Sequence, residues 1–286
     1  MSIDLHTHSH YSDGTKSPTE LVRLAASSGV SALSLTDHDT MGGVEEAVLV
    51  GIEYGVEVVP GLELSVVHKQ KSLHILGYWM DPEHGELSAA LTVLQRARDQ
   101  RNGKIITKLQ ALGIDASAHE LAEISGVGQT GRPHIAKLLM AHGVVRSMQQ
   151  AFDEYLKKDA RAYVDRFAYS AEEAIGLIVR AGGIAVLAHP VQVDKTLNSL
   201  PALLAVLKDF GLEGIETFYP TQSKKMRKKI RQLADVFDLV LTGGSDYHGD
   251  IRPGTRLAGG NNVFVPPGLL DKMKARLQQR LYPSRV

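Results

Sequence analysis

The sequence predicts an α/β protein with a mostly parallel sheet, open or closed into a barrel, and a helical segment inserted into it. Short apolar runs alternate with longer amphipathic segments over most of the chain, as is typical of such sheets. The alternation stops between about Leu87 and Asp165, where only helical patterns occur. A chain of 286 residues, 43% hydrophobic and 22% charged, is long enough for one large domain with a small insert.

The apolar runs have the length and β-branched content of buried strands. They are Ile3–Leu5, Ala32–Leu35, Val56–Val59, Leu73–Leu76, Ile184–Ala188, Ile215–Phe218 and Leu239–Leu241. Leu64–Val67 and Leu73–Leu76 flank a polar stretch, so we expect them to form a hairpin beside the sheet.

Helix start and stop signals occur between these runs. Ser17 is able to cap a helix, Pro18 suits its first turn and Glu20 completes a capping box, while Gly29 ends the pattern. Similar amphipathic patterns predict helices over Gly42–Tyr54, Ala171–Ala181, Pro201–Phe210, Gln222–Val236 and Pro267–Leu281.

The central segment contains helical patterns ending at Leu112 and covering Ala118–Ile124, Pro133–His142 and Met148–Leu156. We therefore assign residues 1–90 and 165–286 to the sheet-containing domain. Residues 91–164 form a predicted helical insert domain that serves substrate recognition.

The composition excludes several classes of site. The chain has no cysteine, which rules out disulfides, thiolate zinc sites, Fe–S ligation and a cysteine nucleophile. Lysine plus arginine (32) balance aspartate plus glutamate (32), which argues against a nucleic-acid coating protein. No apolar run approaches the ~20 residues of a membrane helix, and the polar start leaves no room for a secretory signal. We expect a cytoplasmic protein with no membrane contact and no obligate protein partner.

Many of the twelve histidines gather at the ends of predicted strands together with carboxylates. These residues are His6, His8, Asp13, His38, Glu63, His74, His189, Asp246 and His248. The carboxyl ends of parallel strands converge on one face, so we expect these side chains to meet. A single histidine at a strand end is more often structural, but the whole set requires a shared cause. Imidazoles and carboxylates without sulfur suit Mn, Fe or Zn. More donors than one ion can take predict a multinuclear centre.

Five motifs together resemble the PHP (polymerase and histidinol phosphatase) family. They are His6-Thr7-His8-Ser9 with Tyr11-Ser12-Asp13-Gly14, Thr36-Asp37-His38-Asp39, Pro60-Gly61-Leu62-Glu63, Ala188-His189-Pro190 and Gly244-Ser245-Asp246-Tyr247-His248. The resemblance implies a distorted (β/α)7 barrel and a trinuclear metal centre of the amidohydrolase-like superfamily.

The resemblance also implies how the donors divide among three divalent ions. One ion would be held by His6, His8, Glu63 and Asp246, a second by Asp13, His38 and His248, and a third by Glu63, His74 and His189, with Glu63 bridging. The family often has histidine at the position of Asp13. The harder oxygen donor favours Mn²⁺ over Zn²⁺ and leaves Fe²⁺ open.

The chain length and the helical insert are similar to the family branch of 3′,5′-nucleoside bisphosphate phosphatases. This implies hydrolysis of the 3′-phosphate of pAp, giving AMP and phosphate, by a metal-bound hydroxide. Glu63, Asp246 and His248 are the candidate catalytic residues. The alternative is a 5′→3′ exoribonuclease on short 5′-phosphorylated RNA. A histidinol-phosphate-type phosphatase and a non-catalytic metal module are further alternatives.

Candidate substrate-binding residues lie in the insert: Asn102, Arg132, His134 and Arg161. Pro133 suits the first turn of a helix, so Arg132 and free N–H groups there are able to receive a phosphate. The equal alternative is an ordinary helix start with a surface arginine. Arg98 and Arg101 could also reach a phosphate, but at helical spacing they are more typical of a solvated face. The basic segment from Lys224 to Arg231 either steers polyanions or is simply an exposed helix face.

Overall fold

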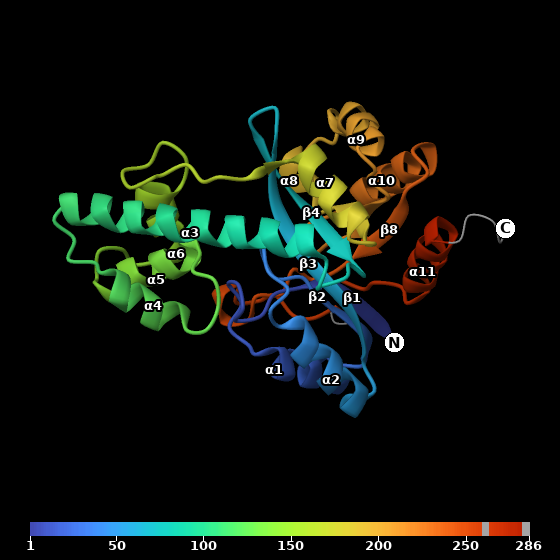
Figure 1. Ribbon diagram of the computed structural model, residues 1–286, viewed down its shortest axis with the longest axis horizontal. Coiled ribbons are helices and arrows are strands. Elements are labelled where there is room, and N and C mark those ends of the chain that lie inside the picture. The colour runs from blue at the N-terminus through green and yellow to red at the C-terminus, as the bar shows by residue number, and fades with distance from the viewer. Residues whose placement is uncertain (259–262, 282–286) are drawn as a thin grey trace.

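The computed structural model describes residues 1–258 and 263–281, and a mixed sheet of eight strands forms the centre of this part of the chain (Figure 1). The strand order is β1-β2-β3-β4-β6-β7-β8, and β5 pairs with β3. The strands are β1 (Ser2–Thr7), β2 (Val30–Leu35), β3 (Glu57–His68), β4 (Lys71–Tyr78), β5 (Tyr169–Ser170), β6 (Ile184–Leu187), β7 (Gly214–Phe218) and β8 (Val240–Gly243). The predicted α/β class is therefore confirmed.

The helices that surround the sheet follow the predicted segments closely. They are α1 (Pro18–Ser27), α2 (Val44–Tyr54), α7 (Ala171–Arg180), α8 (Pro190–Val193), α9 (Leu200–Asp209), α10 (Lys224–Val236) and α11 (Gly268–Leu281), with a 3₁₀ turn at Gly249–Ile251. The capping box of α1 forms as predicted. Ser17 Oγ accepts the Glu20 N–H at 3.1 Å, and Glu20 Oε2 accepts the Ser17 N–H at 2.7 Å. The described residues include no helix with the length and apolar character needed to cross a membrane.

The sheet consists of two parallel halves separated by one reversed strand. Strands β1, β2 and β3 are parallel, as are β6, β7 and β8, but β4 runs antiparallel to both β3 and β6. At the carboxyl end of β1, the His8 N–H donates to Tyr247 O at 2.9 Å, and the Asp246 N–H donates to His6 O at 2.8 Å. The sheet therefore curls until its first and last strands meet at this end. The complete seven-unit barrel stays a prediction.

Strand β3 is one continuous strand, although the sequence predicts two separate segments there. It pairs with β2 through Glu57–Pro60 and with β4 through Gly61–His68. Pro60 lies where the partner strand changes, a position that tolerates a residue without an N–H group. A Cβ at Gly61 would lie 2.4 Å from Ser34 Oγ, so the close approach of the neighbouring strand requires glycine.

Between β4 and β5, a stretch that the structure describes throughout, every element is helical, as predicted. The elements are α3 (Gly85–Ala111), α4 (Ala118–Ser125), α5 (Arg132–Ala141), α6 (Met148–Ala151) and a π-helix (Phe152–Leu156). They bury a hydrophobic cluster of their own that includes Ile105, Leu109, Ile135, Leu139 and Leu156. Figure 1 shows α3 extending away from the sheet with α4 to α6 beside it. The division into two domains stays a prediction.

Candidate metal centre

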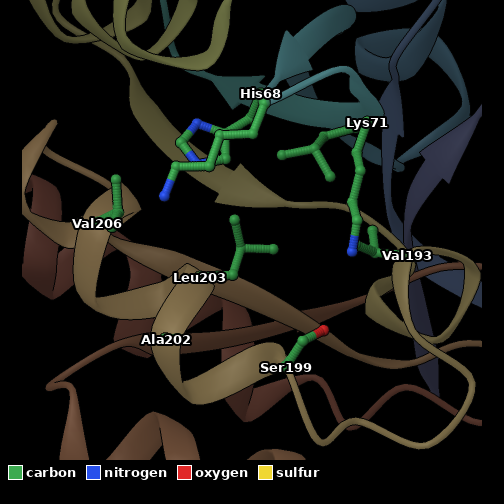
Figure 2. Close-up of a pocket in the computed structure, with 9 residues that line it drawn as sticks. His68, Lys71, Val193, Ser199, Ala202, Leu203 and Val206 are labelled. Atoms are coloured by element: carbon green, nitrogen blue, oxygen red, sulfur yellow. The ribbon is translucent and has the colours of Figure 1, made fainter.

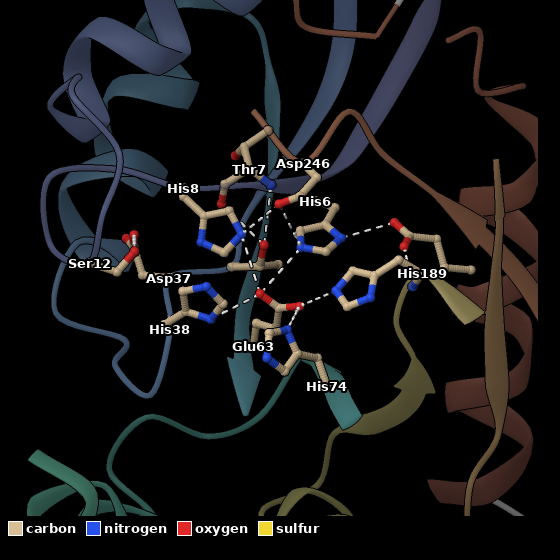
Figure 3. A network of polar contacts seen from close by, with 12 residues as sticks. His6, Thr7, His8, Ser12, Asp37, His38, Glu63, His74, His189 and Asp246 are labelled. Atoms are coloured by element: carbon tan, nitrogen blue, oxygen red, sulfur yellow. Dashed lines mark hydrogen bonds and ion pairs between the residues drawn. The ribbon is translucent and has the colours of Figure 1, made fainter. Parts of the chain in front are cut away.

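Nine acid and histidine side chains meet at the carboxyl end of the sheet. Figure 3 shows His6, His8, His38, Glu63, His74, His189 and Asp246 among them. The nine fall into four overlapping groups whose donor atoms lie within 4.8 Å of one another. The groups are His8, Asp13, His38 and His248; His6, Glu63 and His189; His6, His8 and Asp246; and His38, Glu63 and His74. All nine residues expected to hold metal ions from the sequence are thus brought together. The groups differ from the expected division in three ways. His8 also lies beside Asp13, His38 and His248, Glu63 is not grouped with His6, His8 and Asp246, and His74 and His189 fall in separate groups.

Glu63 lies at the middle of the cluster, with five of the described imidazole rings around its carboxylate (Figure 3). Its Oε1 lies 2.8 Å from His74 Nδ1 and 3.0 Å from His189 Nε2. Its Oε2 lies 3.0 Å from a ring nitrogen of His38 and 3.4–3.5 Å from Nε2 of His8 and His6. The two oxygens therefore face different groups of histidines, an arrangement that suits a carboxylate shared between cations.

Asp246 and Asp13 supply the other carboxylates of the cluster. Asp246 Oδ1 lies 3.3 Å from His8 Nε2 and 3.4 Å from His248 Nδ1. Its Oδ2 accepts the Tyr219 O–H at 2.8 Å and also bonds Arg252. Tyr219 and Arg252 therefore hold one oxygen of Asp246 and leave the other facing the imidazoles. Asp13 Oδ1 lies 3.3 Å from His248 Nε2.

Ring nitrogens inside the cluster have no hydrogen-bond partner among the described residues. The Nε2 atoms of His6, His8 and His248 are buried and form no hydrogen bond, although each lies near a carboxylate. A buried polar atom without a partner is costly, and a bound cation would satisfy several of these nitrogens together. The donor set is nitrogen and oxygen without sulfur, so these residues fit divalent Mn, Fe or Zn ions.

The electrostatics of the cluster suit ligands of a cation. Burial lowers the pKa of His8 to about 3, helped by the charge of His248, so His8 is neutral and has a free lone pair. Burial acts to raise the pKa of Glu63, but the charges of His74, His38 and His6 hold it well below its usual range. Burial acts to lower the pKa of His6 and His38, but the carboxylates around them raise it above its usual value. A bound cation would therefore take the place of protons on these two rings.

The centre opens toward one side of the molecule. The side chains of Asp13, His38 and His74 are 13%, 14% and 26% exposed, whereas those of His6, His8 and Glu63 are at most 1% exposed. The side of the centre that faces solvent is therefore bordered by the loops that follow β1 and β2 and by the β3–β4 hairpin.

One residue of the centre was missed by the sequence analysis. Glu216, on β7, is fully buried and lies 2.9 Å from His6 Nδ1 through its Oε1. Glu216 belongs to no motif. The sequence indicates it only as a charged residue within a predicted buried strand. Asp4, Asp37 and Asp39, which are also buried near the centre, bond backbone N–H groups, hydroxyls or arginine.

Three of the four predicted substrate-binding residues, Arg132, Asn102 and Arg161, differ in their surroundings. Arg132 begins α5, and its Nη1 donates to Leu156 O at 3.2 Å. Asn102 is buried, accepts from Arg101 and donates to Thr130 O at 2.9 Å. Arg161 is exposed, and its guanidinium lies over the ring of Tyr155 at 5.1 Å.

Four arginines cluster beside the centre, and sequence reasoning misjudged two of them. Arg98 and Arg101 are only 8% and 4% exposed, so they do not form a solvated face. Arg98 bonds Asp39, the residue after His38, and Arg166 lies 3.8 Å from the same carboxylate. Burial lowers the pKa of Arg101 to about 9, and the charges of Arg98, Arg166 and Arg132 add to this. The cluster therefore carries an excess of positive charge.

Three of these arginines, Arg101, Arg132 and Arg166, line a cavity of about 540 Å³. Lys158 and Tyr163 also line it, and Asp165 is the acidic residue of the lining. Cations that repel one another in a partly enclosed space form a site for an anion. Arg161 does not line this cavity.

His134, a predicted substrate-binding residue, acts within the fold at the start of α5. It is buried, and its Nδ1 accepts the Gly131 N–H at 3.0 Å. Burial lowers its pKa to about 4 from the 6.5 of an unfolded chain. The unfolded chain therefore takes up a proton that the folded protein excludes, and we expect the free energy of unfolding to fall as the pH drops from 6.5 to 4. The loss approaches roughly 3 kcal/mol at the lower limit.

The His134→Gln variant tests this expectation, because glutamine accepts the same backbone bond and does not titrate. Urea unfolding at pH 7 and pH 5 is expected to show a smaller loss of stability for the variant than for the wild type. Equal losses in the two proteins would contradict the role given to His134.

A second cavity, of about 150 Å³, lies between the β3–β4 turn and α9 (Figure 2). Leu73, Val193, Leu203 and Val206 give it apolar walls, and His68, Lys69, Lys71 and Ser199 also line it. Like the arginine cavity, it is lined by none of the nine centre residues.

Comparisons with known proteins agree with this geometry. A 5′-3′ exoribonuclease from Haemophilus influenzae is 37% identical over 245 residues, covering 86% of this chain and 89% of its own. A 3′,5′-nucleoside bisphosphate phosphatase from Chromobacterium violaceum is 34% identical over 267 residues, 93% of each chain. The crystal structure of a candidate metal-dependent phosphoesterase from Bifidobacterium adolescentis superposes with a TM-score of 0.87 at 29% identity, covering 96% of this chain and 95% of that chain.

The family model described as the PHP domain matches residues 4–238, which include seven of the nine centre residues. The remaining two, Asp246 and His248, follow β8 and meet the others in space. By this match and by its full-length relatives, the chain belongs to the PHP domain family.

Proposed function

We propose that the protein is a metal-dependent phosphatase that removes the 3′-phosphate of 3′,5′-bisphosphate nucleotides. The observation that carries the proposal is the arginine cavity beside the nine-donor centre. One site suits the phosphate that is hydrolysed, and the other suits a second phosphate on the same substrate. The names of the two relatives reported above are consistent with a substrate of this kind.

Three divalent ions, with Mn²⁺ favoured, would be held by the nine residues of the centre. When bound, such ions supply a nucleophile from water at neutral pH and offset the charge of the phosphate oxygens. Glu63 spans the groups through its two oxygens, while Tyr219 and Arg252 hold Asp246 in place. His248 lies between Asp13 and Asp246.

The 5′-phosphate would bind in the arginine cavity. Arg166 lines this cavity and lies 3.8 Å from Asp39, which follows His38, so the cavity adjoins the centre. The positively charged side chains of Arg101, Arg132 and Arg166 line this cavity and exceed its acidic residues in number. Arginine forks match the geometry of phosphate oxygens.

The proposal is tested by measuring phosphate release from pAp, 3′-AMP and 5′-AMP with Mn²⁺ present. We expect pAp to give the highest kcat/KM, 3′-AMP a much lower one and 5′-AMP none. Hydrolysis of 5′-AMP without hydrolysis of pAp would overturn the proposal. A chelator is expected to abolish the activity, and added Mn²⁺ to restore it.

We expect the Arg101→Gln variant to raise KM for pAp by about 10–100-fold with little change in kcat, because it removes a charged bond to the non-reacting phosphate. Its activity on 3′-AMP, which lacks that phosphate, should change little. Arg96→Gln is the matched control, because Arg96 lies on the same helix but is exposed. Equal losses on the two substrates would remove Arg101 from the 5′-phosphate site.

A 5′→3′ exoribonuclease is the second candidate, and the basic face of α10 favours it. Lys224, Arg227, Lys228 and Arg231 line one groove of this helix. Arg227 Nε donates to Gln222 O, and Gln222 Nε2 donates to the backbone carbonyl of Glu216, so α10 begins close to the centre. Stepwise release of mononucleotides from a short 5′-phosphorylated RNA would support this activity, and an unchanged RNA would exclude it.

A further inference from the structure

We infer that Glu216 is a positioning residue that fixes the orientation of two histidines of the metal centre at once. The inference rests on the metal centre of the proposed function, but not on the identity of the substrate. Glu216 belongs to β7, whereas His6 ends β1 and His189 follows β6, so one side chain connects three strands.

The two oxygens of Glu216 have separate partners. Oε1 lies 2.9 Å from His6 Nδ1, and Oε2 accepts the backbone N–H of His189 at 2.6 Å. The carboxylate is fully buried, so water does not compete for either bond. A buried carboxylate that accepts two hydrogen bonds is held in a single orientation.

The bond to His6 determines which ring nitrogen faces the centre. An ionised carboxylate is an acceptor only, so the nitrogen of His6 that it contacts must carry the hydrogen. The opposite nitrogen, Nε2, then points inward, 3.5 Å from both Glu63 Oε2 and Asp246 Oδ1. Nε2 has no hydrogen-bond partner among the described residues, so it is the atom available to a metal ion.

The bond to His189 holds a strained backbone. His189 has φ 24° and ψ 63°, in the left-handed region that residues other than glycine rarely adopt. This conformation places its Nε2 3.0 Å from Glu63 Oε1. By accepting the N–H of His189, Glu216 stabilises the conformation that brings this ring to the centre.

Glutamine cannot replace Glu216. The two donors, His6 Nδ1–H and the His189 N–H, require two acceptor oxygens, and an amide has only one. In a Glu216→Gln variant, the amide NH₂ must face one of them. If it faces His6, the ring must accept at Nδ1 and carry its hydrogen on Nε2, which blocks metal binding there. Aspartate is one methylene shorter and cannot span both partners.

Metal binding to the full-length Glu216→Gln variant tests the inference without any substrate. Metal-free protein is titrated with Zn²⁺ or Mn²⁺ in a calorimeter, and we expect at least one ion to bind about 10–100-fold more weakly than to the wild type. Glu213→Gln is the matched control, because Glu213 lies just before β7 and pairs with Arg280 at 2.6 Å, away from the centre. Binding by Glu216→Gln within twofold of the wild type would overturn the inference.

A second measurement uses the wild-type protein, so it tests the inference even if the Glu216→Gln variant fails to fold. In the Zn²⁺-loaded wild type, which is diamagnetic, ¹⁵N NMR is expected to show a hydrogen on His6 Nδ1 and none on Nε2. A hydrogen on Nε2 instead would overturn the inference. Both measurements are independent of catalysis, so a protein that binds metal as expected but leaves pAp intact would contradict only the proposed function.

Discussion

The Glu63→Gln variant is expected to lose at least about 10²–10³-fold in kcat, the loss typical when one group that stabilises transition-state charge is removed. Glu63 is the carboxylate that contacts all three expected metal groups, through five imidazole rings. Its amide replacement has one acceptor oxygen and an NH₂ group that repels cations. We therefore expect the variant also to bind fewer metal ions.

Steady-state kinetics with pAp and metal analysis of the purified protein check this result. Glu57→Gln is the control, since Glu57 begins the same strand but is about half exposed and pairs with Lys274 at 2.7 Å. A folded Glu63→Gln protein with the activity and metal content of the wild type would rule out Glu63 as a bridging ligand.

The Gly244→Ala variant is expected to be destabilised by about 3 kcal/mol, at the upper end of the usual cost of overpacking. A Cβ at Gly244 would lie 2.4 Å from both the backbone nitrogen and the Cβ of His6. It would also lie 2.8 Å from Asp4 Oδ1, which accepts the Ser245 N–H at 2.9 Å. Strand β1 and the segment after β8 must then separate, and the centre must open with them.

Thermal unfolding measures this effect, with Gly103→Ala as the matched control. Gly103 lies within α3, and a Cβ there would meet nothing within 4 Å. In a helix interior this change stabilises by about 0.5–1 kcal/mol, so the two variants are expected to shift Tm in opposite directions. A Gly244→Ala protein as stable as the wild type would show that the strand ends are not tightly packed.

The strands and the nine centre residues could be predicted because both depend on local patterns. Buried parallel strands appear as apolar runs, and the residues that follow them are placed at one end of the sheet by the topology alone. His74 is the exception to this rule, because it lies within β4, the antiparallel strand. It was found through its predicted hairpin, where the pairing places it opposite Ser65, two residues from Glu63.

The surroundings of the centre could not be predicted, because they depend on contacts between distant segments. Glu216 stands inside an apolar strand, and nothing in its neighbourhood in the sequence indicates that it contacts His6. Arg98 and Arg101 have the spacing of a solvated helix face, but α3 passes beside the loop after β2 and buries both. Arg166 lies outside any helix and has no motif, so only the fold brings it to Asp39.

Asp39 is one of the residues that connect the helices to the rest of the protein, beside the Gln129 N–H bond to Tyr11 O and the packing of Leu87 and Leu91 against the sheet. Its side chain bonds Arg98 of α3, its carbonyl accepts the Gln129 Nε2–H at 2.9 Å, and its N–H donates to Glu63 O at 3.0 Å. The outer turns of α3 and the helices α4 to α6 lie beyond this attachment. Under the proposed function, insertions and deletions there would alter which nucleotides bind. Under that proposal, changes in the helices would alter selectivity and leave the nine centre residues in place.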